Sequence, residues 1–151
     1  MRPRIIIEQF VSDSEDASDL TDYKFYCFEG QPTYCQVIAG RKVKNDKAVY
    51  HIDFYDMNWI HMPFSGMKRN SPHAPELHPM PTSFEDMKRI AHDLAKGTHF
   101  VRIDFYEIDG KPKFGEFTLY PLSGFGGFEP EEWNQRLGDL IVLPTDKQCN
   151  I

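Results

Sequence analysis

The chain has 151 residues, of which 40% are hydrophobic and 26% are charged, and this size and composition predict one globular domain with a substantial core. Its 23 acidic and 17 basic side chains give a formal net charge of −6, which argues against nonspecific binding to nucleic acid or to an anionic membrane. No apolar run is long enough for a membrane span or a signal sequence, so we expect a cytoplasmic protein.

The first half of the chain reads mainly as β-structure. Residues 4–11 predict a strand or strand end, and the acidic, serine-rich run at 12–19 predicts a mobile loop. Residues 22–30 and 32–40 are rich in aromatic and β-branched side chains and predict a hairpin, and residues 48–56 predict a third strand. We therefore expect an antiparallel sheet.

The best helical pattern covers residues 83–96, where apolar side chains recur every three or four positions. Thr82 or Ser83 is suited to capping its start, and Gly97 to ending it. The preceding stretch, 58–81, contains five prolines and is longer than an ordinary connection, which indicates a functional or partly mobile loop.

Residues 99–120, HFVRIDFYEIDGKPKFGEFTLY, predict a second hairpin with a tight turn at Asp109-Gly110. Side chains alternate between the two faces of a strand, so a polar set and an apolar set separate onto opposite faces. The polar set is Arg102, Asp104, Glu116 and Thr118. The apolar set, which we expect to pack against a core, is Val101, Ile103, Phe105, Phe117 and Leu119.

One cation and two carboxylates on one sheet face indicate a site for a metal and a phosphate. Bringing Asp104 and Glu116 together costs Coulomb repulsion, which a divalent cation relieves, and carboxylate oxygens suit Mg²⁺ that is shared with substrate phosphates. The alternative is a hairpin that merely displays its charges to solvent.

The chain then continues with a glycine-rich loop, SGFGGF at 123–128, and a short predicted helix at 130–140. Strands, helix, strands and helix in this order predict an α+β fold, with helices packed on one face of an antiparallel sheet.

Five ordered segments resemble the TupA-like ATP-grasp family, which is associated with the synthesis of teichuronopeptide and other surface polysaccharides. They are IIIEQFV, DYKFYCFEGQP, DFYDMNW, FVRIDFYEIDGKPKFGEFTLYPLSGF and EPEEWNQRLGDLI. The similarity extends over essentially the whole chain and corresponds to the C-terminal half of an ATP-grasp enzyme.

The resemblance implies a nucleotide site built from the first strands. Its hinge, whose backbone hydrogen-bonds adenine, corresponds to Glu8, Gln9, Phe10 and Val11. Asp22 matches the acidic residue that holds the ribose hydroxyls, and Lys24 matches a residue that reaches phosphate oxygens or an acyl-phosphate intermediate. A surface sheet face decorated with charges is the alternative for Asp22 and Lys24.

The resemblance also implies roles for the second hairpin. Asp104 and Glu116 match the Mg²⁺ ligands, and Arg102 matches the arginine that stabilises the transferring phosphoryl group. Thr118 stands where the wider superfamily has an asparagine ligand, and a hydroxyl is a weaker ligand. Ser123 and Gly124 fall where the family places a loop for the acceptor substrate.

These matches imply a single domain, 1–151, that begins at the hinge and lacks the N-terminal lobe. We therefore expect either a completing lobe supplied by another chain or self-association through exposed apolar surface. The implied function is an ATP- and Mg²⁺-dependent carboxylate–amine ligase of surface-polymer synthesis, acting on a carboxylate and an amine. Two alternatives remain: a noncatalytic nucleotide-binding or interaction domain, and a sugar-transfer enzyme of surface glycan synthesis.

Overall fold

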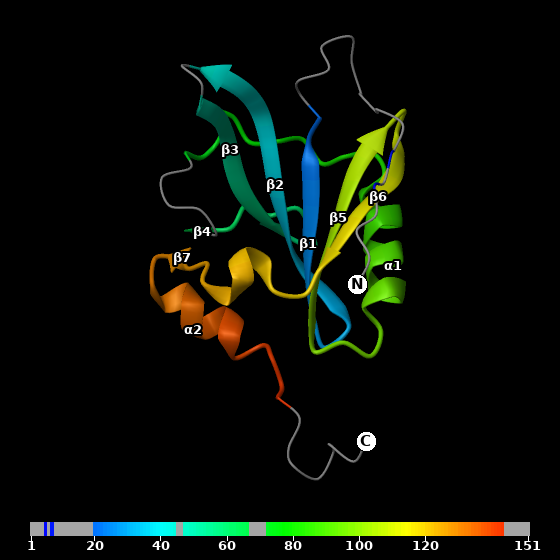
Figure 1. Ribbon diagram of the computed structural model, residues 1–151, viewed down its shortest axis with the longest axis vertical. Coiled ribbons are helices and arrows are strands. Elements are labelled where there is room, and N and C mark those ends of the chain that lie inside the picture. The colour runs from blue at the N-terminus through cyan, green and yellow to red at the C-terminus, as the bar shows by residue number, and fades with distance from the viewer. Residues whose placement is uncertain (1–4, 6, 8–19, 45–46, 67–71, 144–151) are drawn as a thin grey trace.

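The computed structural model describes residues 5, 7, 20–44, 47–66 and 72–143 (Figure 1). The elements in chain order are β1 (Asp22–Phe28), β2 (Gln31–Lys44), β3 (Lys47–Asp56), β4 (Ser65–Gly66), α1 (Phe84–Ala95), β5 (Phe100–Ile108), β6 (Lys111–Thr118), the 3-10 helix η1 (Pro121–Gly124), β7 (Phe128–Glu129) and α2 (Glu132–Gly138). No helix in this part of the chain has both the length and the apolar character needed to cross a bilayer.

Five strands form one sheet in the order β3-β2-β1-β5-β6, and every neighbouring pair is antiparallel. Both predicted hairpins are present. Glu29 and Gly30 turn the first at φ values of 47° and 75°, and Asp109 and Gly110 turn the second at 51° and 67°. Two successive positive φ values match the twist of the flanking strands. The predicted α+β class with an antiparallel sheet is confirmed.

One face of the sheet packs against α1, and we call the buried residues between them the α1-side core. The predicted helix is confirmed, since α1 spans Phe84–Ala95 within the predicted 83–96. The residues of the α1-side core are Phe25, Cys27, Cys35, Val37, Ala39, Tyr55, Phe84, Met87, Ala91, Ala95, Val101, Ile103 and Phe105.

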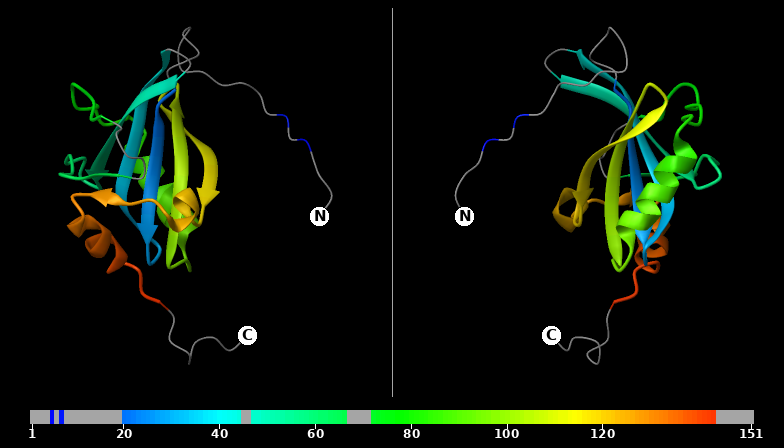
Figure 2. Two further views of the ribbon diagram at one scale, coloured as in Figure 1. Left: turned by 60° about the vertical axis from the view of Figure 1, so that its left-hand side comes forward. Right: turned by 90° about the vertical axis from the view of Figure 1, so that its right-hand side faces the viewer.

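The opposite face packs against α2 and the small β4–β7 sheet, and we call the buried residues there the α2-side core (Figure 2). Its members are Tyr26, Phe28, Ile52, Phe54, Phe64, Trp133 and Leu137. The sequence predicted helices on one face, and the structure differs in this detail. The central strand β1 buries apolar side chains on both faces, so each face needs its own cover.

The predicted apolar face of the second hairpin is only partly buried. Val101, Ile103 and Phe105 are buried in the α1-side core, whereas Phe117 and Leu119 are half-exposed. The cause is position, because β6 is an edge strand and α1 packs mainly over β2, β1 and β5. The predicted strand at 4–11 and loop at 12–19 lie outside the described residues, apart from Ile5 and Ile7, which are exposed.

Candidate functional site

The pairing of β1 with β5 brings two distant polar segments onto one face of the sheet. Lys24 stands opposite Asp104, and Tyr26 stands opposite Arg102. On the other side of β5, Arg102 stands opposite Thr118 of β6. The strands therefore place the predicted catalytic and metal-binding side chains around a common point on the α2 side of the sheet.

Arg102 is at the centre of this arrangement. Its Nε donates to Asp104 Oδ1 at 2.8 Å, and its Nη2 donates to Asp104 Oδ2 at 2.8 Å. The same Nη2 also lies 3.0 Å from Glu116 Oε1 and 2.9 Å from Thr118 Oγ1. Three oxygens from three residues thus surround one nitrogen atom, and the predicted polar set of the hairpin is brought together.

Lys24 extends the cluster to the neighbouring strand. Its Nζ contacts Asp104 Oδ2 and lies 3.3 Å from Asp22 Oδ1. Asp22 is paired in turn with Arg41 of β2. We call these seven residues the polar cluster: Asp22, Lys24, Arg41, Arg102, Asp104, Glu116 and Thr118.

Much of the polar cluster is shielded from water. The side chains of Asp22 and Asp104 are each 2% exposed, whereas that of Glu116 is 63% exposed. Burial by itself lowers the pKa of Arg102, but its hydrogen bonds to Asp104 and the Asp104 charge outweigh burial and raise that pKa. Arg102 is therefore a permanent cation. Among the three charged residues that the second hairpin contributes to the polar cluster, Glu116 alone is exposed as the solvent-facing alternative requires, and Arg41 is the other exposed charge of the polar cluster.

The donor set around Arg102 fits Mg²⁺ in its chemistry. Asp104, Glu116 and Thr118 offer two carboxylates and a hydroxyl, and hard oxygen ligands are the kind that Mg²⁺ binds. The position between these oxygens is taken by the Arg102 guanidinium, so a cation would bind there only after Arg102 turned away.

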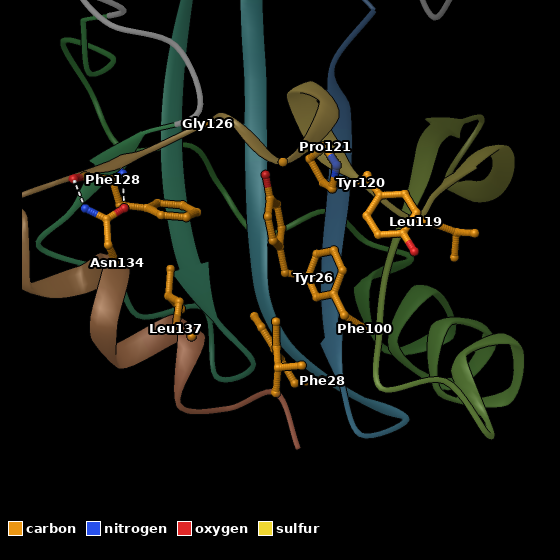
Figure 3. A pocket seen from close by; sticks show the side chains of 13 residues that line it. Tyr26, Phe28, Phe100, Leu119, Tyr120, Pro121, Gly126, Phe128, Asn134 and Leu137 are labelled. Carbon is orange, nitrogen blue, oxygen red and sulfur yellow. Dashed lines mark hydrogen bonds between the residues drawn. The ribbon is translucent and has the colours of Figure 1, made fainter. Parts of the chain in front are cut away.

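Figure 3 shows the side chains that line an apolar pocket of about 340 Å³. One of them, Tyr26, stands opposite Arg102 of the polar cluster in the pairing of β1 with β5. Tyr26 and Phe100 contribute from the sheet, and Leu119 follows Thr118 directly in the chain. The full lining is Tyr26, Phe28, Phe100, Leu119, Tyr120, Pro121, Gly124, Gly126, Phe128, Asn134, Leu137, Gly138 and Ile141. Burial raises the pKa of Tyr26, so its hydroxyl stays protonated and lies within 3.3 Å of Gln36 Oε1.

The predicted substrate loop meets this pocket. Gly124 lines it, and Ser123 lies in η1, exposed and with a φ of 57°. The predicted hinge residues Glu8, Gln9, Phe10 and Val11 lie outside the described residues, so their relation to the polar cluster stays a prediction.

Arg41 is the member of the polar cluster that sequence reasoning missed. It follows Gly40, whose φ is +66°, within a register shift between Ala39 and Lys42. Such a bulge redirects the side chains that follow it. The one sequence signal was a glycine inside a strand pattern, which indicates a bulge without telling where the next side chain points.

Comparison with models of protein families gives a match over most of the chain. The family model described as TupA-like ATPgrasp matches residues 1–142. No curated protein and no solved structure matches the chain significantly.

Proposed function

Because the chain belongs to the TupA-like ATP-grasp family, we propose that it provides the nucleotide- and metal-binding face of an ATP- and Mg²⁺-dependent carboxylate–amine ligase. Such a ligase transfers the γ-phosphoryl group of ATP to a carboxylate, which gives an acyl phosphate and ADP. An amine then attacks the acyl carbon and displaces inorganic phosphate to form an amide. We place this activity in the cytoplasmic synthesis of a surface polysaccharide or teichuronopeptide, as the resemblance implies.

The proposal rests on one observation, which is that three side-chain oxygens surround Arg102 Nη2. Oxygens of Asp104, Glu116 and Thr118 lie between 2.8 and 3.0 Å from this atom. A site for a metal and a polyphosphate needs oxygen ligands and cations side by side, and the polar cluster has both.

Asp104 and Glu116 would hold Mg²⁺, with Thr118 as a weaker oxygen donor. When bound, Mg²⁺ neutralises charge on the phosphates and orients them. Arg102 would then turn from its carboxylates to a phosphoryl oxygen, and Lys24 would bind a second one. Exchanging one anionic partner for another keeps both cations compensated in a largely buried place.

Asp22 would accept hydrogen bonds from the ribose hydroxyls, while Glu8, Gln9, Phe10 and Val11 would bind adenine through their backbone. Ser123 and Gly124 would position the acceptor substrate. The pocket supports this last role. Gly124 lines the pocket, and so does Tyr26, which stands opposite Arg102 in the pairing of β1 with β5.

We also propose that residues 1–151 act as one domain that resembles the C-terminal lobe of an ATP-grasp enzyme. An N-terminal lobe, or a second copy of this chain, would complete the nucleotide site. The half-exposed apolar side chains of Phe114 and Phe117 on the edge strand β6 support this proposal, because such surface favours a protein contact.

Calorimetric titration with ATP, with and without Mg²⁺, tests the proposal. We expect Mg²⁺-dependent binding by the native chain. Glu116→Gln should weaken the Mg²⁺-dependent part by at least about tenfold, because even the loss of an outer partner of a metal site costs about 10–100-fold in affinity.

Glu132→Gln is the matched control. The Glu132 side chain is 62% exposed, close to the 63% of Glu116, but Glu132 lies on α2 outside the polar cluster. Equal affinities of the two variants would contradict the proposed site. Absence of ATP binding by the native chain would mean that these residues do not bind nucleotide without the second lobe, or that the domain is noncatalytic. Stronger binding of a UDP-sugar than of ATP would favour sugar transfer instead.

A noncatalytic role is the second candidate, and the charge balance favours it. Within the polar cluster three cations face three carboxylates, and each carboxylate already has a cationic partner. Such a cluster is complete without a ligand. Nucleotide-independent binding of a partner protein, together with no response to ATP, would support this candidate.

A further inference from the structure

A second cluster of chemically active side chains lies away from the polar cluster. Asp53 lies on β3 between Ile52 and Phe54, and both of these neighbours belong to the α2-side core. Asp53 therefore points to the other face of the sheet, the side that α1 covers. Its neighbours there have no part in the proposed ligase site.

Two histidines converge on the Asp53 carboxylate. His61 Nε2 lies 2.9 Å from Asp53 Oδ1, and His73 Nδ1 lies 2.7 Å from the same oxygen. One nitrogen from each ring and one carboxylate oxygen all fall within 4.8 Å of one another. Among the described residues this is the one such group of three or more histidine, cysteine or acidic side chains.

We propose that Asp53, His61 and His73 form a binding site for a divalent transition metal ion, with Zn²⁺ as the physiological candidate. Two imidazoles and one carboxylate are a ligand set that zinc uses, with water in the fourth position. Imidazole nitrogens favour Zn²⁺ over the oxygen-preferring Mg²⁺ and Ca²⁺. Nitrogen and oxygen ligands lie about 2 Å from zinc, so the observed separations are of the size that one ion spans.

The cluster is held in place by contacts that need no metal. Ala74 N donates to Asp53 Oδ2 at 2.9 Å, and Ile52 N donates to Pro72 O at 3.2 Å, so both sides of His73 are tied to β3. His61 forms a bridge with Tyr55, which places it next to the same strand. A metal would therefore meet ligands that are already gathered, and little ordering entropy would oppose its binding.

The exposure of the three side chains suits a site with an open position. The Asp53 side chain is 1% exposed, whereas those of His61 and His73 are 28% and 49% exposed. A metal would enter from the histidine side and keep a water ligand there. The bound metal would link the proline-rich segment 72–81 to β3. A hydrogen bond from His78 N to Tyr55 Oη, 2.9 Å long, already links the two.

Zinc titration of the full chain, followed by competition with a chromophoric chelator, tests the proposal. We expect one Zn²⁺ per chain, and His61→Gln and His73→Gln should each weaken binding by at least about tenfold. Co²⁺ should bind at the same site and give visible d–d absorption bands. His92→Gln, a histidine on α1 outside the cluster, is the matched control and should bind as the native chain does.

Two further measurements show whether Zn²⁺ binds at this cluster and not elsewhere. Glu116→Gln should leave Zn²⁺ affinity unchanged, which separates this site from the proposed Mg²⁺ site. Histidine side-chain ¹⁵N spectra of the native chain should show Zn²⁺-dependent shifts at His61 and His73. Absence of stoichiometric binding, or equal affinity in the His61→Gln/His73→Gln double variant, would overturn the proposal and leave a purely hydrogen-bonded cluster.

Discussion

At the scale of single residues, Arg102 and Asp104 hold the polar cluster together. Asp104 accepts from both Nε and Nη2 of Arg102 and also contacts Lys24, so two cations depend on one buried carboxylate. Glu116 pairs with one cation, Arg102, and accepts a hydrogen bond from Thr118 Oγ1, but it does so from the exposed rim, where water competes. The two carboxylates therefore differ in what they contribute to folding, although both are proposed to bind the same metal.

We predict that Asp104→Asn lowers the free energy of unfolding by about 3 kcal/mol or more, because removing one member of a buried charge network leaves its partners short of compensation. Glu116→Gln should cost less than about 1 kcal/mol, as exposed pairs do. Urea denaturation of both variants at neutral pH measures the difference. Equal losses would show that burial does not distinguish the two carboxylates.

At the scale of elements, the start of α1 is held by the neighbouring sheet. The sequence predicted a cap by Thr82 or Ser83, but Ser83 makes no capping hydrogen bond. Its Oγ donates instead to Glu107 Oε2 at 2.6 Å, its N donates to the same oxygen at 2.7 Å, and Thr82 Oγ1 donates at 3.2 Å. Glu107 of β5 thus fastens the first turn of the helix to the sheet.

This contact makes stability depend on pH. Burial raises the pKa of Glu107, but hydrogen bonds from Ser83 and Thr82 outweigh it and lower that pKa below its usual value. The stabilisation is therefore fully present above the unfolded pKa of about 4.3 and is lost as pH falls through the lower folded value. We predict that Glu107→Gln costs about 1 kcal/mol at pH 7 and progressively less as pH falls below about 4.

Urea unfolding of the native chain and of Glu107→Gln between pH 7 and pH 3 measures this convergence. Glu85→Gln, a change at an exposed position in the first turn of α1, is the control. A difference between the native chain and Glu107→Gln that stays constant over this range would contradict the assigned role of the carboxylate.

At the scale of the whole molecule, the two cores share their central strand. Phe25 and Cys27 of β1 belong to the α1-side core, while Tyr26 and Phe28 belong to the α2-side core. Neither core can lose its packing without disturbing β1. We therefore expect the described part of the chain to unfold in one cooperative transition.

Trp133→Ala tests this coupling. Trp133 of α2 stacks on Phe64 with ring centroids 4.3 Å apart and is buried. We predict that the free energy of unfolding falls by about 3–5 kcal/mol. The midpoint of the unfolding transition should fall to the same value by near- and far-ultraviolet circular dichroism. Leu77→Ala, at an exposed position, is the control. Separate transitions for the two probes would mean that α2 detaches while the sheet and α1 stay folded.

The sequence by itself determined the five strands of the main sheet, the two α-helices and the local geometry of the second hairpin, but not β4, η1 or β7. Strand alternation and the Asp109-Gly110 turn were sufficient to place Arg102 and Thr118 on one face, and the structure pairs them across β5 and β6. The recurrence of apolar residues every three or four positions was likewise sufficient to predict α1. Both depend on interactions between residues close in the chain, which is why local patterns predict them.

Only the tertiary structure decided which distant segments meet. Lys24 reaches Asp104 across 80 residues because β1 pairs with β5, and spacing alone did not predict that register. Asp53 and His73 likewise come from segments 20 residues apart. The choice among such pairings depends on how the whole sheet buries apolar surface on both of its faces, and that balance is a property of the complete fold rather than of any single segment.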